Sequence, residues 1–114
     1  MGGTVNLPEQ AVAMKYSTKS SGGSVTFMQH DRQWQWQIIS DRTVEEIMGD
    51  ISEYASETET AAVNGVTLTA YGLADGVIAF WSEGEHAMAL YGEQGVPLAD
   101  ALTVAGQVME ANHG

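Results

Sequence analysis

The chain has 114 residues, 44% of them hydrophobic and 17% charged, which suits one compact folded domain rather than a disordered segment. Fifteen acidic and four basic residues give a net charge of −11. This charge argues against binding to nucleic acid or to anionic membranes, because such binding uses Lys and Arg. The absence of cysteine excludes disulfides, thiolate catalysis and cysteine-based zinc sites.

The first elements along the chain are predicted to be two strands joined by a short turn. Residues 11–18 alternate between apolar and polar side chains, and residues 24–30 do the same. The Ser-Ser-Gly-Gly sequence at 20–23 is typical of a turn, since Gly accepts a positive φ at low steric cost. Residues 1–9 carry neither a basic stretch nor an apolar run, so we expect no signal peptide or spanning helix there, and we expect these residues to be flexible.

A third strand is predicted over residues 33–38, where tryptophan and glutamine alternate strictly. Trp34 and Trp36 share one face of this strand. The other face carries three glutamines: Gln33, Gln35 and Gln37. The two tryptophans are interpreted either as a stacking surface for a sugar or peptide or as part of the core. We favour the core, because buried aromatic side chains remove a large apolar area from water.

The pattern then changes to that of a helix, predicted over residues 43–55. Thr43 and Glu46 form the Ser/Thr-x-x-Glu pattern of a capping box, which satisfies free backbone donors at a helix start. Apolar side chains follow at three- and four-residue spacing: Val44, Ile47, Met48, Ile51, Tyr54 and Ala55. The acidic residues fall mainly on the other side, so the helix is amphipathic.

The second half of the chain predicts four strands and a closing helix. The strands are expected over residues 58–63, 66–72, 77–82 and 86–91. The dipeptide Asn64-Gly65 is a strong signal for a two-residue hairpin between the first two. The helix is expected over residues 97–110, and Trp81 is interpreted as a clamp between the sheet and this helix.

Together these elements predict a single α+β domain over residues 1–114. Their order is β-β-β-α-β-β-β-β-α, with no internal repeat and no interdomain linker. One antiparallel sheet of about six or seven strands, with both helices packed on one face, is the simplest way to bury the apolar sides of these elements.

The acidic residues are concentrated in the later part of the chain. No Lys or Arg follows Arg42, whereas twelve of the fifteen acidic residues do, so residues 43–114 carry a charge of −12. This segment is interpreted as a negative face for a basic partner, as a mimic of nucleic-acid phosphate, or as an ordinary solvated surface that keeps the protein soluble. The acidic residues are interleaved with apolar ones, which favours the solvated surface.

No catalytic, cofactor-binding or metal-binding residue is assigned from the sequence, and we expect a protein that is not an enzyme. The three histidines have no metal-ligand spacing: His30, His86 and His113. A metal ion held by His86 with Glu83 and Glu85 is a minor alternative. An acid–base pair of the same two glutamates is disfavoured, because Gly84 between them indicates a turn. Neither a Gly-x-Ser-x-Gly elbow nor a Gly-rich phosphate loop with a following Lys occurs.

Three segments of the second half, 63–71, 77–91 and 96–105, carry a family resemblance. They contain the Asn64-Gly65 hairpin, a strand that ends in Trp81 before a polar Gly-containing turn, a strand that ends near Tyr91, and a last helix. In this pattern the chain resembles a family of uncharacterised extracytoplasmic domains at the C-terminal end of anti-sigma-factor-like membrane proteins and lipoproteins of Gram-positive bacteria. The resemblance implies no established activity and no catalytic residue.

These observations predict a non-enzymatic interaction or sensor domain with a protein partner. The resemblance implies the extracytoplasmic part of a larger membrane-associated bacterial protein, tethered through a segment outside this chain, with no membrane insertion by the chain itself. The alternative is a cytoplasmic acidic inhibitor or DNA mimic that binds a basic protein. The sheet edges are candidates for pairing with a partner strand. The candidate partner-binding residues form an exposed polar platform on one sheet face: Gln33, Gln35, Gln37, Thr67, Thr69 and Tyr71.

Overall fold

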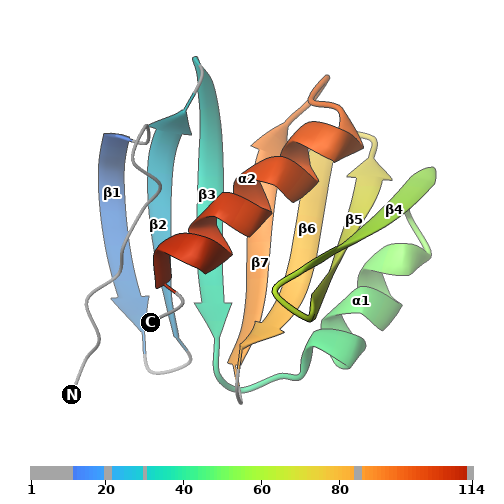
Figure 1. Cartoon of the computed structure of the whole chain (residues 1–114), viewed down its shortest axis with the longest axis horizontal. Helices are drawn as coiled ribbons and strands as arrows, with labels where there is room; N and C mark the ends of the chain where they lie inside the picture. The colour runs from blue at the N-terminus through green and yellow to red at the C-terminus, as the bar shows by residue number, and fades with distance from the viewer. Residues whose placement is uncertain (1–11, 20–21, 30, 84–85, 113–114) are drawn as a thin grey trace.

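The computed structural model describes residues 12–19, 22–29, 31–83 and 86–112 (Figure 1). The strands are β1 (Val12–Lys19), β2 (Gly22–Gln29), β3 (Arg32–Ile39), β4 (Glu57–Val63), β5 (Val66–Leu73), β6 (Gly76–Glu83) and β7 (His86–Glu93). The helices are α1 (Val44–Ser52), between β3 and β4, and α2 (Leu98–Asn112), after β7. The predicted α+β class and the predicted order of elements are therefore confirmed. The predicted flexibility of residues 1–9 lies outside the described residues.

All seven strands form one antiparallel sheet in the order β1-β2-β3-β7-β6-β5-β4. The first three strands form a meander, and α1 then carries the chain across the sheet to the far edge at β4. A second meander returns from β4 to β7, which pairs with β3 from Trp34–Gly92 to Ile39–Ala87. The strands β1 and β4 are thus the two edges of the sheet.

The two helices cover opposite faces of the sheet, so the prediction that both pack on one face is wrong. Successive residues of a strand point to opposite faces, and β6 shows the division. Its residues Val77, Ala79 and Trp81 belong to one core cluster with α2. Ile78 and Phe80, between them, belong to a second cluster with α1.

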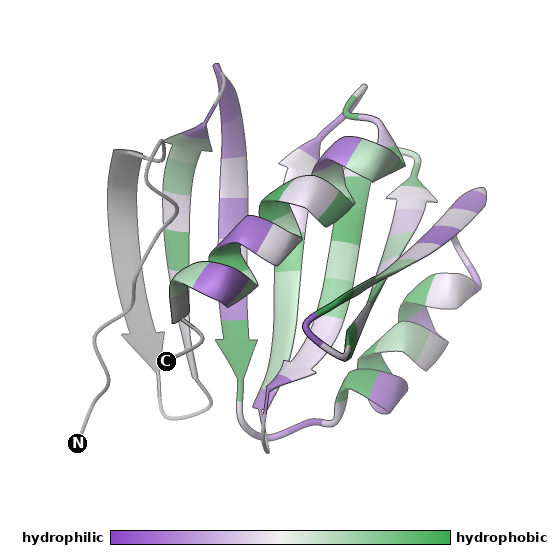
Figure 2. Ribbon diagram, in the orientation of Figure 1, coloured by the Kyte–Doolittle hydropathy of each residue, from purple (hydrophilic) through white to green (hydrophobic). Residues whose placement is uncertain are grey.

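The physical reason is that the central strands are apolar on both faces. The run from Val77 to Trp81 contains no polar residue, whereas β3 alternates tryptophan with glutamine, a contrast visible in the colours of Figure 2. With both helices on one side, Ile78 and Phe80 would lie in water, at a cost of roughly 1.5–3 kcal/mol for each side chain. A strand that is hydrophobic throughout therefore requires cover on both faces.

The three tryptophans lie in the core, as predicted, and all three are on the side of α2. Trp34 and Trp36 on β3 are each 2% exposed, and Trp81 on β6 is 1% exposed. All three belong to the cluster that includes the buried α2 residues Leu102 and Met109. Trp81 therefore packs between the sheet and the last helix, which confirms its predicted role as a clamp.

Helix α1 begins at the predicted capping box and ends earlier than predicted. The Glu46 backbone N–H donates to Thr43 Oγ1 and the Thr43 N–H donates to Glu46 Oε1, each at 3.2 Å. After Ser52, the Tyr54 N–H bonds to Ile51 O, which tightens the last turn and takes Tyr54 out of the apolar stripe. The chain then extends because pairing with β5 begins, with a 2.9 Å bond from Ser56 N–H to Gly72 O. Tyr54 is consequently 76% exposed.

The β4–β5 hairpin turns at the predicted dipeptide and bends toward α2. Asn64 and Gly65 have φ angles of 51° and 79°, the two positive values that a type I′ turn requires. Val63 and Val66, on either side of the turn, pack against the core cluster on the α2 side. In Figure 1 β4 accordingly runs at a steep angle to β6 and β7.

Candidate functional site

The sheet opens between β5 and β6 at one end. The register pairs of these strands run from Leu73–Gly76 to Thr69–Phe80 and stop there. Both strands continue beyond this last pair, β5 back to Val66 and β6 onward to Glu83. The cause is the bend of the β4–β5 hairpin toward α2, which draws the start of β5 away from its neighbour. Alternate residues of an antiparallel strand direct their N–H and C=O to each side, so backbone groups of both strands face the opening.

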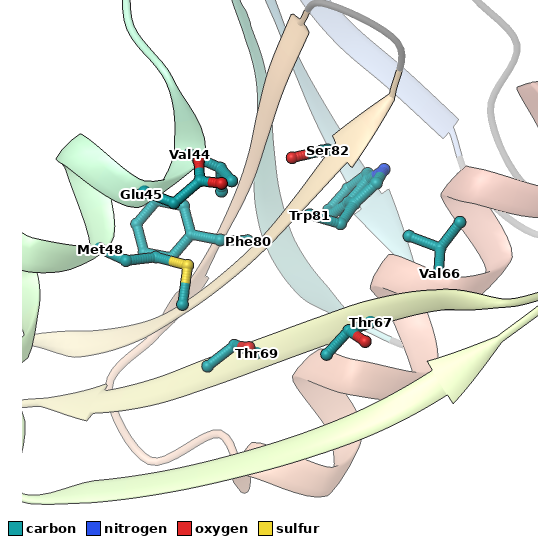
Figure 3. Close-up of a pocket in the computed structure, with 9 residues that line it drawn as sticks. All are labelled: Val44, Glu45, Met48, Val66, Thr67, Thr69, Phe80, Trp81 and Ser82. Atoms are coloured by element: carbon teal, nitrogen blue, oxygen red, sulfur yellow. The ribbon is translucent and has the colours of Figure 1, made fainter.

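A cleft of about 340 Å³, here named the β5–β6 cleft, lies at this opening on the side of α1 (Figure 3). Its lining comes from three elements: Val44, Glu45 and Met48 of α1; Val66, Thr67 and Thr69 of β5; and Phe80, Trp81 and Ser82 of β6. In Figure 3 the α1 residues stand beside Phe80 and the threonines of β5 lie opposite them. The cleft thus joins an apolar floor to two strand edges.

The groups in the β5–β6 cleft are suited to binding. Three hydroxyls, from Thr67, Thr69 and Ser82, donate and accept hydrogen bonds, and the Glu45 carboxylate accepts them. Met48, which is half-buried, supplies apolar and polarisable contact area beside Phe80, which is only 1% exposed. The described lining residues include neither histidine nor a basic side chain to activate a hydroxyl as a nucleophile. This arrangement can hold an extended chain by backbone pairing and by side-chain contacts.

The residues predicted to form a polar platform lie on one face of the sheet, the face that carries α1. They are Gln33, Gln35 and Gln37 on β3 and Thr67, Thr69 and Tyr71 on β5. Strands β6 and β7, with α1 above them, separate the glutamines from the β5 residues. Thr67 and Thr69 line the β5–β6 cleft, whereas the glutamines do not.

Exposure also differs among the platform residues. Gln33 and Thr67 are exposed, whereas Thr69 and Tyr71 are only 8% exposed each. The Tyr71 ring packs edge-on against Phe80, with the ring centroids 6.2 Å apart. Tyr71 is therefore part of the core under α1. Met48 and Ser82 were not assigned to a binding site from the sequence, because neither belongs to a recognisable binding motif. The only signal in the sequence was the apolar run of β6, which indicates that a helix with an apolar stripe covers this face.

A series of exposed carboxylates, here named the acidic edge, occurs in and around α1 and β4. Its seven members lie between residues 41 and 59, on and around α1 and β4: Asp41, Glu45, Glu46, Asp50, Glu53, Glu57 and Glu59. Arg42 is the basic residue in this stretch, and its Nη2 lies 2.6 Å from Asp50 Oδ2. The hydrogen bond to Asp50 raises the pKa of Arg42 above its ordinary value. The acidic edge keeps a strong net negative charge.

The described residues do not support the alternative metal site at His86 or the acid–base pair of glutamates. His86 Nδ1 lies 3.2 Å from the hydroxyl of Ser40. Within the described part of the chain, no group of three His, Asp or Glu side chains is arranged to hold a metal ion. Glu85, His30 and His113 lie outside the described residues, so the predictions about them have no structural outcome.

Among the described residues, no helix is long and apolar enough to cross a lipid bilayer. No protein-family model matches the chain, and neither the curated proteins nor the solved structures gave a match.

Proposed function

We propose that the chain is a non-enzymatic interaction domain that takes an extended segment of a protein partner into the β5–β6 cleft. The single observation that carries the proposal is the early end of the β5–β6 ladder, where two strands continue unpaired with each other beside an apolar cleft. A peptide that adds to an exposed strand edge gains affinity from main-chain hydrogen bonds and specificity from pockets for alternate side chains.

The lining of the cleft indicates the chemistry of the partner segment. The half-buried Val44, Met48 and Val66 favour apolar side chains that point into the cleft. Glu45 at the cleft and the other exposed carboxylates of α1 favour basic side chains that point outward. The partner segment is therefore extended, with apolar and basic residues in alternation.

The cellular setting is a separate part of the proposal, and the family resemblance of residues 63–105 supports it. The domain would be the extracytoplasmic portion of a larger membrane-associated bacterial protein. A reading frame that encodes a membrane-spanning helix ahead of residue 1 is the expected finding. A reading frame without one would remove the tethering and leave the cytoplasmic alternative, without affecting the cleft.

The cleft is tested with a displayed library of random linear peptides and two matched variants. Thr67→Trp places a large ring in the cleft, whereas Thr58→Trp places the same ring on exposed β4, outside the lining. We expect the wild-type chain to enrich peptides in which apolar and basic residues alternate. Those peptides should bind the Thr58→Trp variant normally and the Thr67→Trp variant at least about tenfold more weakly, since the ring occupies their site.

Two outcomes would contradict the proposal. The library yields no enriched sequence, or the enriched peptides bind both variants equally well. Far-UV circular dichroism of the two variants separates loss of binding from loss of folding.

The acidic edge supports a second candidate, an inhibitor that mimics DNA and blocks a basic protein. All seven of its carboxylates are exposed, and they follow one another along α1 and β4. The test is whether the chain displaces duplex DNA from a bacterial histone-like protein at low salt. The double variant Glu57→Gln/Glu59→Gln should then lose displacement while Thr67→Trp retains it. No displacement by the wild type would remove this candidate.

A further inference from the structure

A second cleft, of about 220 Å³, lies on the opposite face of the sheet, between α2 and the adjoining ends of β2 and β3. It is named here the α2 cleft. The sheet contributes Gln29, Arg32 and Trp34, and α2 contributes Asp100, Thr103 and Gln107. This volume is below the roughly 300–1,000 Å³ of pockets for drug-sized ligands, which limits an occupant to a very small molecule.

Two deeply buried polar side chains of this cleft have atoms without a hydrogen-bond partner. Gln29 is 2% exposed, and its Nε2 donates to Gln107 Oε1 at 2.5 Å, while its Oε1 has no partner. Reversing the amide would only exchange the roles of the two atoms, and one of them would still lack a partner. Trp34 is equally buried, and its Nε1 also has no partner, which is equally true of Trp36 and Trp81 elsewhere in the core. Such groups are rare in folded proteins, because a buried polar group without a hydrogen bond is costly.

The position of the Trp34 ring places its N–H edge on the side of Gln29. A Cβ built on Gly92 of β7 would lie 2.7 Å from Trp34 Cζ3 and 3.2 Å from Cε3, so this edge of the indole lies over β7. Nε1 is on the opposite edge of the ring and therefore faces away from β7. Gln29 stands on β2, on the other side of β3, and the pairs Phe27–Trp34 and Gln29–Arg32 place it diagonally next to Trp34 on the same face. A donor and an acceptor without partners thus lie close together.

The charged residues of the α2 cleft are of opposite sign and are not paired with each other. Among the described residues, neither Arg32 nor Asp100 takes part in an ion pair. A ligand with only one charge would be attracted by one of these side chains and repelled by the other. A ligand that carries both charges would be attracted by both.

From these observations we infer that the α2 cleft binds a small zwitterion of the α-amino acid class. Arg32 and the Trp34 N–H bind the carboxylate, because a guanidinium and an N–H are both donors. Asp100 and the Gln29 carbonyl bind the ammonium group, because both are acceptors. This site is on the face opposite the β5–β6 cleft and is independent of the function proposed for that cleft.

The test is calorimetric titration of the full chain with the free α-amino acids, their N-acetyl derivatives and their amides. The wild type should bind at least one free amino acid with a Kd below about 1 mM and should reject both derivatives. Asp100→Asn should weaken the binding of free amino acids about tenfold or more, and the variant should no longer discriminate against the N-acetyl forms. Arg32→Gln should instead lose the discrimination against amides. The same substitutions outside the cleft, Asp75→Asn and Arg42→Gln, serve as controls. They should change neither the affinity for free amino acids nor the discrimination against the derivatives.

The discrimination pattern distinguishes a binding role from a structural one. Asp100 lies in the first turn of α2, where a carboxylate also stabilises the helix end, but a loss of helix stability does not change which derivative binds. The indole N–H resonance of Trp34 should shift when the amino acid is added. The inference would be overturned if no amino acid bound the wild type, or if the cleft variants and the controls bound amino acids equally well.

Discussion

At the scale of single residues, the packing of Trp34 depends on a glycine on the neighbouring strand. A Cβ at Gly92 would lie 2.7 Å from Trp34 Cζ3 and 2.9 Å from Val77 Cγ2, and both side chains are held in the core. Gly92→Ala should therefore lower the free energy of unfolding by about 1–3 kcal/mol, the usual cost of overpacking. Urea denaturation measures this change.

Gly49 in α1 provides the matched control for that substitution. A Cβ there would meet nothing within 4 Å. Gly49→Ala should raise the free energy of unfolding by roughly 0.5–1 kcal/mol, since Ala favours the helix. A destabilised Gly49→Ala variant, or a neutral Gly92→Ala variant, would show that these packing distances are wrong.

Tyr91 on β7 gives the protein a predicted sensitivity to alkali. Burial raises the pKa of Tyr91 above its ordinary value of 10.0. The folded state therefore keeps this proton to a higher pH than the unfolded state, and stability decreases as pH rises from about 10 through the raised pKa. Below pH 10 the contribution is complete. Unfolding measured between pH 8.5 and 11 should show a smaller alkaline decrease in Tyr91→Phe than in the wild type, and equal decreases would contradict the assignment.

At the scale of elements, α1 depends on its N-cap because it has only nine residues. Thr43→Ala removes the side-chain acceptor of the capping box and should cost about 1 kcal/mol in the free energy of unfolding. Thr103→Ala on the exposed side of α2 is the control. Its hydroxyl bonds back to Ala99 O within the helix, so its removal should be neutral or slightly stabilising. Equal losses in the two variants would contradict a specific role for the cap.

The strands and helices could be predicted from local sequence patterns, but the way they pack together could not. The Trp–Gln alternation of β3, the capping box and Asn64-Gly65 each act over a few residues, and each appears where the sequence indicated. The placement of the helices depends on which strands become neighbours in the sheet. The periodicity of apolar residues within one segment does not indicate which strands these are. The unbroken apolar run of β6 was the signal that both faces need cover.

The candidate site was predictable only in part, for a related reason. Period-two alternation placed Thr67 and Thr69 on one face correctly, and both line the β5–β6 cleft. The same alternation could not show that Tyr71 is covered by packing around Phe80 under α1. The opening of the sheet depends on the packing of Val63 and Val66 toward α2, a long-range contact.

At the scale of the whole molecule, the net charge of −11 opposes compaction through self-repulsion. Raising NaCl from about 20 mM to about 500 mM shortens the Debye length from roughly 20 Å to about 4 Å and screens this repulsion. The exposed Arg42–Asp50 pair loses little on screening. The melting temperature should therefore rise by several degrees, and a decrease would mean that attractive ion pairs dominate.

Amide hydrogen exchange measured by NMR shows whether β5 and β6 are open at this end of the sheet. In the free chain, amides that face the opening, among Val66–Leu68 and Trp81–Ser82, should exchange faster than those of the ladder from Thr69 to Leu73. A peptide selected on the β5–β6 cleft should slow the former and leave β3 unchanged. Protection of all these amides in the free chain, or slowing by the peptide at other strands only, would contradict the account.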